Sequence, residues 1–72
     1  MTRDELVADG LVTVREAAKF LSVSRTTIYE LMDDGELPFS KIRGSRRIPI
    51  AALRALAAKN LKGVDPPTTV NT

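Results

Sequence analysis

The chain has 72 residues, of which 43% are apolar and 28% are charged, and these are ordinary values for a folded globular protein. This length allows one small domain and excludes a two-domain enzyme, since so short a chain buries only about 60% of its unfolded surface. The absence of cysteine and histidine excludes disulfides and the usual zinc sites and removes the commonest general base, so we expect neither metal, nor cofactor, nor enzyme activity.

Residues 1–10 carry no sustained apolar period and end at Gly10, which predicts a flexible or partly helical N-terminal arm. Charged residues stand where a signal peptide would have its apolar core. No stretch approaches the roughly 20 apolar residues of a membrane span. We therefore expect a cytoplasmic protein.

Two short helices are predicted next. Thr13-Val14-Arg15-Glu16 fits a capping box, so a helix begins there, and its apolar positions lie on one face: Val14, Ala17, Ala18 and Leu21. Ser24 is a suitable N-cap for a second helix that runs to about Asp34 and buries Ile28, Leu31 and Met32. Gly35 is expected to end it in a left-handed conformation. The connection of about three residues is typical of a helix-turn-helix unit.

Between Leu37 and Ile50 the apolar period changes towards two, which predicts a β-hairpin. A three-residue loop of residues 44–46 would place Ile42 opposite Ile48, both facing the core, and Arg43 opposite Arg47. Lys41, Arg43 and Arg47 would then face solvent or a ligand. Pro49 has no amide hydrogen, so the second strand is expected to be short or to lie at an edge.

Residues 51–61 are rich in good helix formers, which predicts a further helix with a buried stripe of Leu53, Leu56, Ala57 and Leu61. Gly63 follows it. Residues 62–72 contain two prolines and no apolar period, so we expect a disordered tail.

The predicted order of helix, tight turn, helix, basic hairpin and helix is that of a winged helix-turn-helix domain, mainly α with a small β-hairpin, over residues 11–61. In residues 11–18, 21–29, 35–38 and 46–49 and at Leu53, the sequence resembles the excisionase-type DNA-binding domain of the MerR-like superfamily. It departs from that family at Ser22, where the family usually has glycine.

The resemblance implies sequence-specific binding of double-stranded DNA without catalysis, through the second helix and the wing. Opposite the buried stripe of that helix lie the residues that a groove would meet. Arg25 can reach a guanine edge, Glu30 can accept a hydrogen bond from cytosine, and hydroxyls near the helix start suit phosphates. The candidate DNA contacts are Ser24, Arg25, Thr26, Thr27, Tyr29 and Glu30 in the helix, and Lys41, Arg43, Ser45, Arg46 and Arg47 in the wing.

Three functions stay open. The resemblance implies an accessory, recombination directionality factor, bacterial or phage-encoded and nucleoid-associated, that binds or bends DNA for a separate integrase. Three to five phosphate contacts would give a salt slope, the change of log binding constant with log salt concentration, of only about −3 to −4.5, so a single domain should bind DNA weakly. We therefore expect copies of the chain to associate cooperatively on DNA, and to be weakly associated or monomeric in its absence. The alternatives are a small transcriptional regulator that binds promoter DNA with the same domain, and a protein-interaction module that uses the tail or the leucine stripe.

Overall fold

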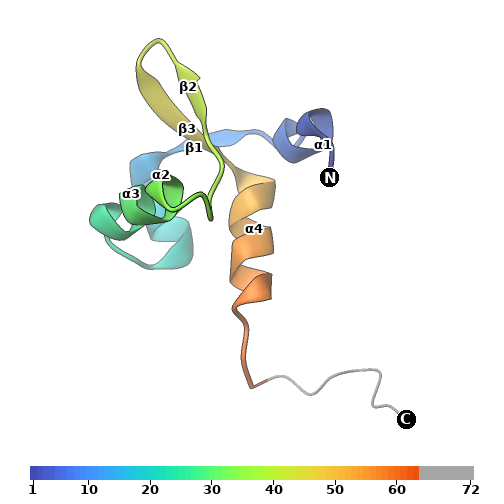
Figure 1. Cartoon of the computed structure of the whole chain (residues 1–72), viewed down its shortest axis with the longest axis vertical. Coiled ribbons are helices and arrows are strands. Elements are labelled where there is room, and N and C mark those ends of the chain that lie inside the picture. Colours follow the sequence, from blue (N-terminus) through green and yellow to red (C-terminus); the bar gives the residue numbers. More distant parts are fainter. Residues whose placement is uncertain (64–72) are drawn as a thin grey trace.

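The computed structural model describes residues 1–63 of the chain. In Figure 1 the β2–β3 hairpin projects away from α2 and α3, while α4 runs in the opposite direction. The predicted winged helix-turn-helix architecture is confirmed, with additions at the N-terminus and in the sheet; the tail residues 64–72 lie outside the described part. The elements are α1 (Arg3–Val7), β1 (Leu11–Thr13), α2 (Val14–Leu21), α3 (Arg25–Asp33), β2 (Ser40–Ile42), β3 (Ser45–Pro49) and α4 (Ile50–Lys59).

The N-terminal arm contains the short helix α1, which begins with a capping box between Thr2 and Glu5. The helix contacts α4 and buries none of its own residues fully. Beyond it, Asp9 accepts a 2.8 Å ion-paired hydrogen bond from Arg54 on α4. Both side chains are more than half exposed, so this pair adds little stability.

Helix α2 begins at the predicted capping box. The Thr13 hydroxyl accepts the Glu16 backbone N–H at 3.1 Å, and the Glu16 carboxylate accepts the Thr13 backbone N–H at 2.9 Å. The backbone hydrogen bond from Thr13 lowers the pKa of Glu16, and Arg47 on β3 adds a smaller attraction. A carboxyl group whose pKa is lower in the folded than in the unfolded chain stabilises the fold when it is ionised. This contribution is complete at pH values above the unfolded pKa and is lost as the pH falls through the folded pKa.

Replacing Thr13 with alanine is expected to lower the free energy of unfolding by about 0.5–2 kcal/mol at neutral pH, because the helix loses its N-cap. The Glu16 pKa should rise only in part, because the variant keeps the Thr13 backbone N–H that chiefly lowers it and loses only the smaller effect of the hydroxyl; an NMR titration measures this. Most of the stability difference from the wild type should therefore persist when the pH falls through the folded Glu16 pKa. Thr2→Ala is the matched control, with a smaller effect because α1 buries no residue. Equal losses from both variants would contradict this account.

Both helices of the helix-turn-helix unit end in the same way. The N–H of Val23 donates to the carbonyl of Ala18, and the N–H of Glu36 donates to the carbonyl of Leu31, the six-residue hydrogen bond of a Schellman motif. The left-handed residue is Ser22 after α2, with φ 56°, and Gly35 after α3, with φ 79°. Ser22 therefore adopts a backbone conformation that glycine tolerates more easily.

The sheet has three antiparallel strands in the order β1-β3-β2, so the predicted hairpin gains a strand from residues 11–13. The predicted hairpin register is wrong. Ile42 pairs with Ser45, which leaves a two-residue turn of Arg43 and Gly44. Both turn residues have positive φ, 51° and 80°, as in the type I′ turn whose twist matches that of the two strands.

The new register separates the two isoleucines. Ile48 pairs with Val12 of β1 and is fully buried, whereas Ile42 is 50% exposed. Pro49 lies in the central strand, so of the two predicted alternatives, a short strand or an edge strand, the structure shows the first. Pro49 is the last residue of β3, and the backbone turns into α4 at this point. The strand is short, as predicted, with five residues.

The core joins α2, α3, β3 and α4 around the buried side chains of Ala17, Ala18, Ile28, Met32, Leu37, Ile48, Ala52, Leu53 and Leu56. Leu53 and Leu56 confirm half of the predicted stripe on α4. Ala57 and Leu61 are exposed, because α4 ends at Lys59 and nothing among the described residues covers its last turn. Three of these core residues are alanines, and Ala51 is also buried, so four small side chains allow the helices to approach closely.

Candidate nucleic-acid interface

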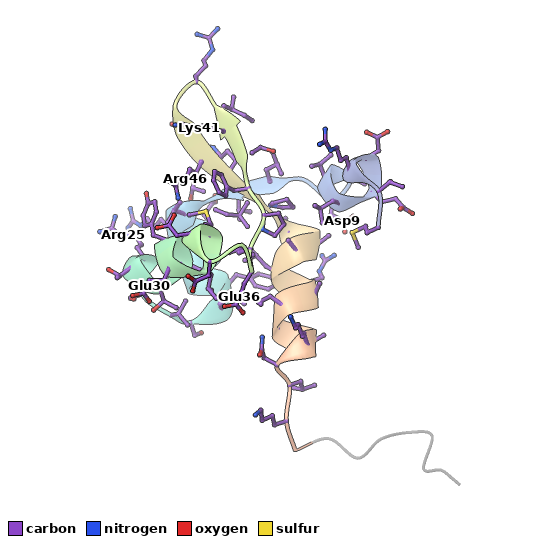
Figure 2. The ribbon with its side chains drawn as sticks, viewed as in Figure 1. Asp9, Arg25, Glu30, Glu36, Lys41 and Arg46 are labelled. Atoms are coloured by element: carbon purple, nitrogen blue, oxygen red, sulfur yellow. The ribbon has the colours of Figure 1, made fainter. Side chains whose placement is uncertain are left out.

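The exposed face of α3 carries the residues that the sequence predicts for a groove. Thr26 and Glu30 are exposed, opposite the buried Ile28 and Met32. Arg25 is the first residue of the helix and is also exposed. Figure 2 shows Arg25 and Glu30 on α3, on the side of the molecule away from α1 and α4.

The two hydroxyls at the start of α3 are partly used within the chain. Ser24 is the N-cap, and its hydroxyl accepts the Thr27 backbone N–H at 3.1 Å. The hydroxyls of Ser24 and Thr27 also lie 3.0 Å apart. Thr27 is half-buried, so of these two Ser24 is the more accessible to a ligand.

The hairpin of β2 and β3 (residues 40–49) is the wing. A cleft of about 440 Å³ lies between the wing and α3. It brings together residues that lie far apart in the sequence: Arg25 and Tyr29 of α3, and Ser45 and Arg47 of β3. Gly44 of the turn, Arg46, and the start of α2 complete its walls. The cleft therefore has a cationic lining from both the helix and the wing.

Arg15 also lines this cleft, although it was not among the predicted DNA contacts. It lies one turn before Lys19 on the exposed side of α2, and both residues line a second hollow with Ser22 and Arg25. Three cationic side chains, two on α2 and one on α3, thus continue the basic surface beyond the cleft. Their spacing of four residues on an amphipathic helix was the sequence signal for Arg15 and Lys19.

The wing residues fall into different environments. Lys41 and Arg43 are exposed and do not line the cleft, with Arg43 in the turn at the tip. Arg47 is half-buried at the cleft and donates a 3.1 Å hydrogen bond to the carbonyl of Arg46. Arg46 is half-buried, and its guanidinium is turned towards Tyr29 and Asp33 of α3. Figure 2 labels it between the hairpin and α3.

An acidic stretch lies in the last turn of α3 and just beyond it, and its four carboxylates are all on exposed residues: Glu30, Asp33, Asp34 and Glu36. Asp33 pairs with Arg46 of the wing at 3.5 Å. This pair connects the acidic stretch to the basic wing within a single chain. No helix within residues 1–63 combines the length and apolarity needed to cross a membrane.

The fold and its basic cleft define a small DNA-binding domain of the winged helix-turn-helix class. Residues 11–61, more than half of the chain, match a protein family described as a helix-turn-helix domain. The chain therefore belongs to this helix-turn-helix family, and its resemblance to excisionase-type domains is confirmed.

Two relatives match over part of the chain. Over 42 residues, 58% of this chain and 32% of the relative, it is 43% identical to a Mycobacterium tuberculosis protein named "Putative antitoxin VapB50". Over 49 residues, 68% of this chain and 50% of the relative, it is 45% identical to a Saccharopolyspora erythraea protein named "Probable excisionase". The aligned part of the chain thus spans no more than half the length of either relative. No solved structure matches the chain significantly.

Proposed function

We propose that this chain binds double-stranded DNA in a sequence-specific manner, with α3 in the major groove and the wing on the flanking backbone or minor groove. The cleft carries the proposal, because it joins Arg25 of α3 to Arg47 of the wing and Arg15 of α2 in one cationic surface. When α3 lies in the major groove of a duplex, phosphates of the DNA backbone lie on both sides of this helix.

Within α3, Arg25 is proposed to read a base through two hydrogen bonds to guanine, and Glu30 to accept one from the amino group of cytosine. Thr26 is exposed for a phosphate or a base edge. Ser24 and Thr27 stand at the helix N-terminus, where backbone amides favour phosphate. Tyr29, a 43% exposed residue that lines the cleft, can donate a hydrogen bond from its hydroxyl to a phosphate.

In the wing, Lys41, Arg43 and Arg47 are proposed to neutralise phosphates, with Ser45 adding a hydroxyl at the cleft. Arg15 and Lys19 extend this role along α2. These contacts supply affinity without sequence information, and each phosphate neutralised raises the salt slope by about 0.9. Arg46 was predicted as a further contact of this kind, but its guanidinium faces Tyr29, Phe39 and Asp33 within the chain.

We propose that the biological role is that of an accessory factor that positions or bends DNA for a separate integrase. The similarity to the protein named "Probable excisionase" supports this role. The proposed partners are therefore duplex DNA, further copies of the chain on adjacent sites, and the integrase. Cooperative binding follows from the small number of phosphate contacts that one wing and one helix can make.

A second candidate is a small regulator that binds promoter DNA with the same surface. The observation in its favour is the similarity to a protein that carries a different name, "Putative antitoxin VapB50", which indicates that related domains occur in proteins of more than one role. The cleft would serve both functions equally well. The DNA site that the chain selects therefore decides between them.

The test is selection of a random duplex pool on the purified chain near physiological salt, followed by sequencing and a salt titration on the selected site. We expect a short motif, and spaced direct repeats of it if binding is cooperative. A position beside an integrase gene favours the accessory role, and a position within a promoter favours the regulator. Failure to enrich any motif, with binding lost above low salt, would overturn the proposed function.

A further inference from the structure

We propose that Arg46 is a positioning residue, which holds the wing at a fixed distance from α3 and does not bind a phosphate. The proposal rests on the proposed function, since it concerns how the two parts of the DNA-binding surface are kept in place. It departs from the sequence-based prediction, which grouped Arg46 with the other wing cations. Its basis is the environment of the guanidinium group.

The guanidinium lies among two aromatic rings and one carboxylate. Its carbon is 5.2 Å from the ring centre of Tyr29 and 4.7 Å from that of Phe39, both within the range of a cation–π contact. One of its terminal nitrogens lies 3.5 Å from the carboxylate of Asp33. That nitrogen is fully buried and makes no hydrogen bond, so it is not available to a phosphate.

These four residues, the Arg46 cluster, come from three different segments. Tyr29 and Asp33 lie on α3 one turn apart, Phe39 precedes β2, and Arg46 lies on β3. Side chains alternate between the two faces of a strand, so Arg46 lies on the same face of β3 as the buried Ile48, which is two residues further along. The cluster thus extends the contact between the sheet and α3 beyond the edge of the core, towards the wing tip.

The wing has few other contacts to hold it. Within the described residues, β2 contributes no buried side chain, and Ile42 near the tip is half exposed. The innermost anchor of the hairpin is Ile48, which is fully buried. The pairing of β3 with β1 ends at Arg47, which lies opposite Thr13. Without the Arg46 cluster, the part of the hairpin beyond Arg47 would pivot about this point, and the width of the cleft would vary.

A variable cleft affects specific and non-specific binding differently. Specific binding requires the wing cations and Arg25 to meet the duplex at the same time, so a mobile wing has to be ordered first. Non-specific binding depends on the number of neutralised phosphates, which a mobile wing retains. Loss of the cluster should therefore lower the preference for the selected site while leaving the salt slope unchanged.

The experiment compares Arg46→Met and Arg46→Lys with the control Lys41→Met, which removes an exposed cation directly opposite Arg46 on β2. We expect Arg46→Met to reduce the ratio of specific to non-specific affinity about five- to tenfold, with the salt slope as in the wild type. Lys41→Met should lower the slope by about 0.9 and leave the ratio unchanged. Arg46→Lys keeps the charge but loses the planar stacking, so it should recover the ratio only in part.

A second readout uses the free protein. Residual dipolar couplings should show the hairpin at a fixed orientation to α3 in the wild type and averaged over orientations in Arg46→Met, with α2, α3 and α4 folded in both. This readout tests the cluster even if the wild type selects no DNA motif, an outcome that would overturn only the proposed function.

Two results would overturn the positioning role. One is a salt slope lowered by about 0.9 in Arg46→Met and restored in full by Arg46→Lys, because lysine is a competent phosphate ligand. The other is an unchanged hairpin orientation in Arg46→Met. If Arg46→Met does not fold, Arg46→Lys is measured in its place, and an unchanged ratio of specific to non-specific affinity together with an unchanged hairpin orientation would contradict the proposal.

Discussion

Replacement of Ile48 with alanine is expected to lower the free energy of unfolding by about 2–5 kcal/mol, because it deletes a fully buried side chain. Ile48 lies in the central strand and packs with residues of α2, α3 and α4 in one core. The free energy of unfolding expected for a chain of this length is about 4–11 kcal/mol, so the variant should lose a large part of it. Urea denaturation followed by circular dichroism measures the change.

Ile42→Ala is the matched control for this experiment. Ile42 is 50% exposed in the wing, so its truncation should change the free energy of unfolding by less than about 0.5 kcal/mol. The pair of variants also distinguishes the observed two-residue turn from the three-residue loop that the sequence suggests. Comparable losses in both variants would mean that both isoleucines face the core, contrary to the observed strand pairing.

Replacement of Arg25 with alanine is expected to cost about 1–3 kcal/mol of binding to the selected DNA site, about 5- to 150-fold in affinity. The reason is the loss of two hydrogen bonds to one guanine. The loss should be confined to one base position, so a repeated selection with the variant should return the same motif with that position relaxed. Quantitative competition with single-base variants of the site measures this.

Arg47→Ala supplies the contrast, since Arg47 lies across the same cleft in the wing. It should weaken binding to all sequences alike and lower the salt slope by about one. Equal effects of both variants on all DNA sequences would mean that α3 is not the helix that reads bases. The comparison requires both proteins to melt as the wild type does.

The helices were predictable from the sequence because their signals are local. Thr13 and Ser24 cap the helices that they precede, and Gly35 ends α3 with positive φ, as the sequence indicates. The apolar spacing also identified the buried faces of α2 and α3. Each of these signals acts over four or five residues, within the range that local pattern and capping describe.

The sheet was less predictable, because its pairing is not local. Strand β1 has three residues and pairs with β3, which lies more than thirty positions further along the chain. No pattern within either segment predicts this pairing. The hairpin register failed because Arg43 adopts positive φ, which residue preferences disfavour for arginine. The twist of the strands favours the type I′ turn over that preference.

Part of the basic surface could be located from the sequence, but its arrangement could not. The sequence indicated which cations lie on α3 and the wing, and the structure places Arg25 and Arg47 at one cleft. Arg15 joins them only through the fold, since α2 and β3 are distant in the sequence. The surroundings of Arg46 depend on Phe39 and Tyr29, whose rings meet only when the hairpin packs on α3.

The alanine-rich core has a consequence for the lifetime of the protein. Of the ten buried apolar residues, four are alanines, which contribute little to the free energy of folding. A ligand that binds only the folded state adds about 2.7 kcal/mol to the free energy of unfolding when its concentration is one hundred times its Kd. Proteases degrade such a chain through its opened form, so copies bound to a target would persist while unbound copies are cleared. Turnover would then match the amount of protein to the number of occupied sites.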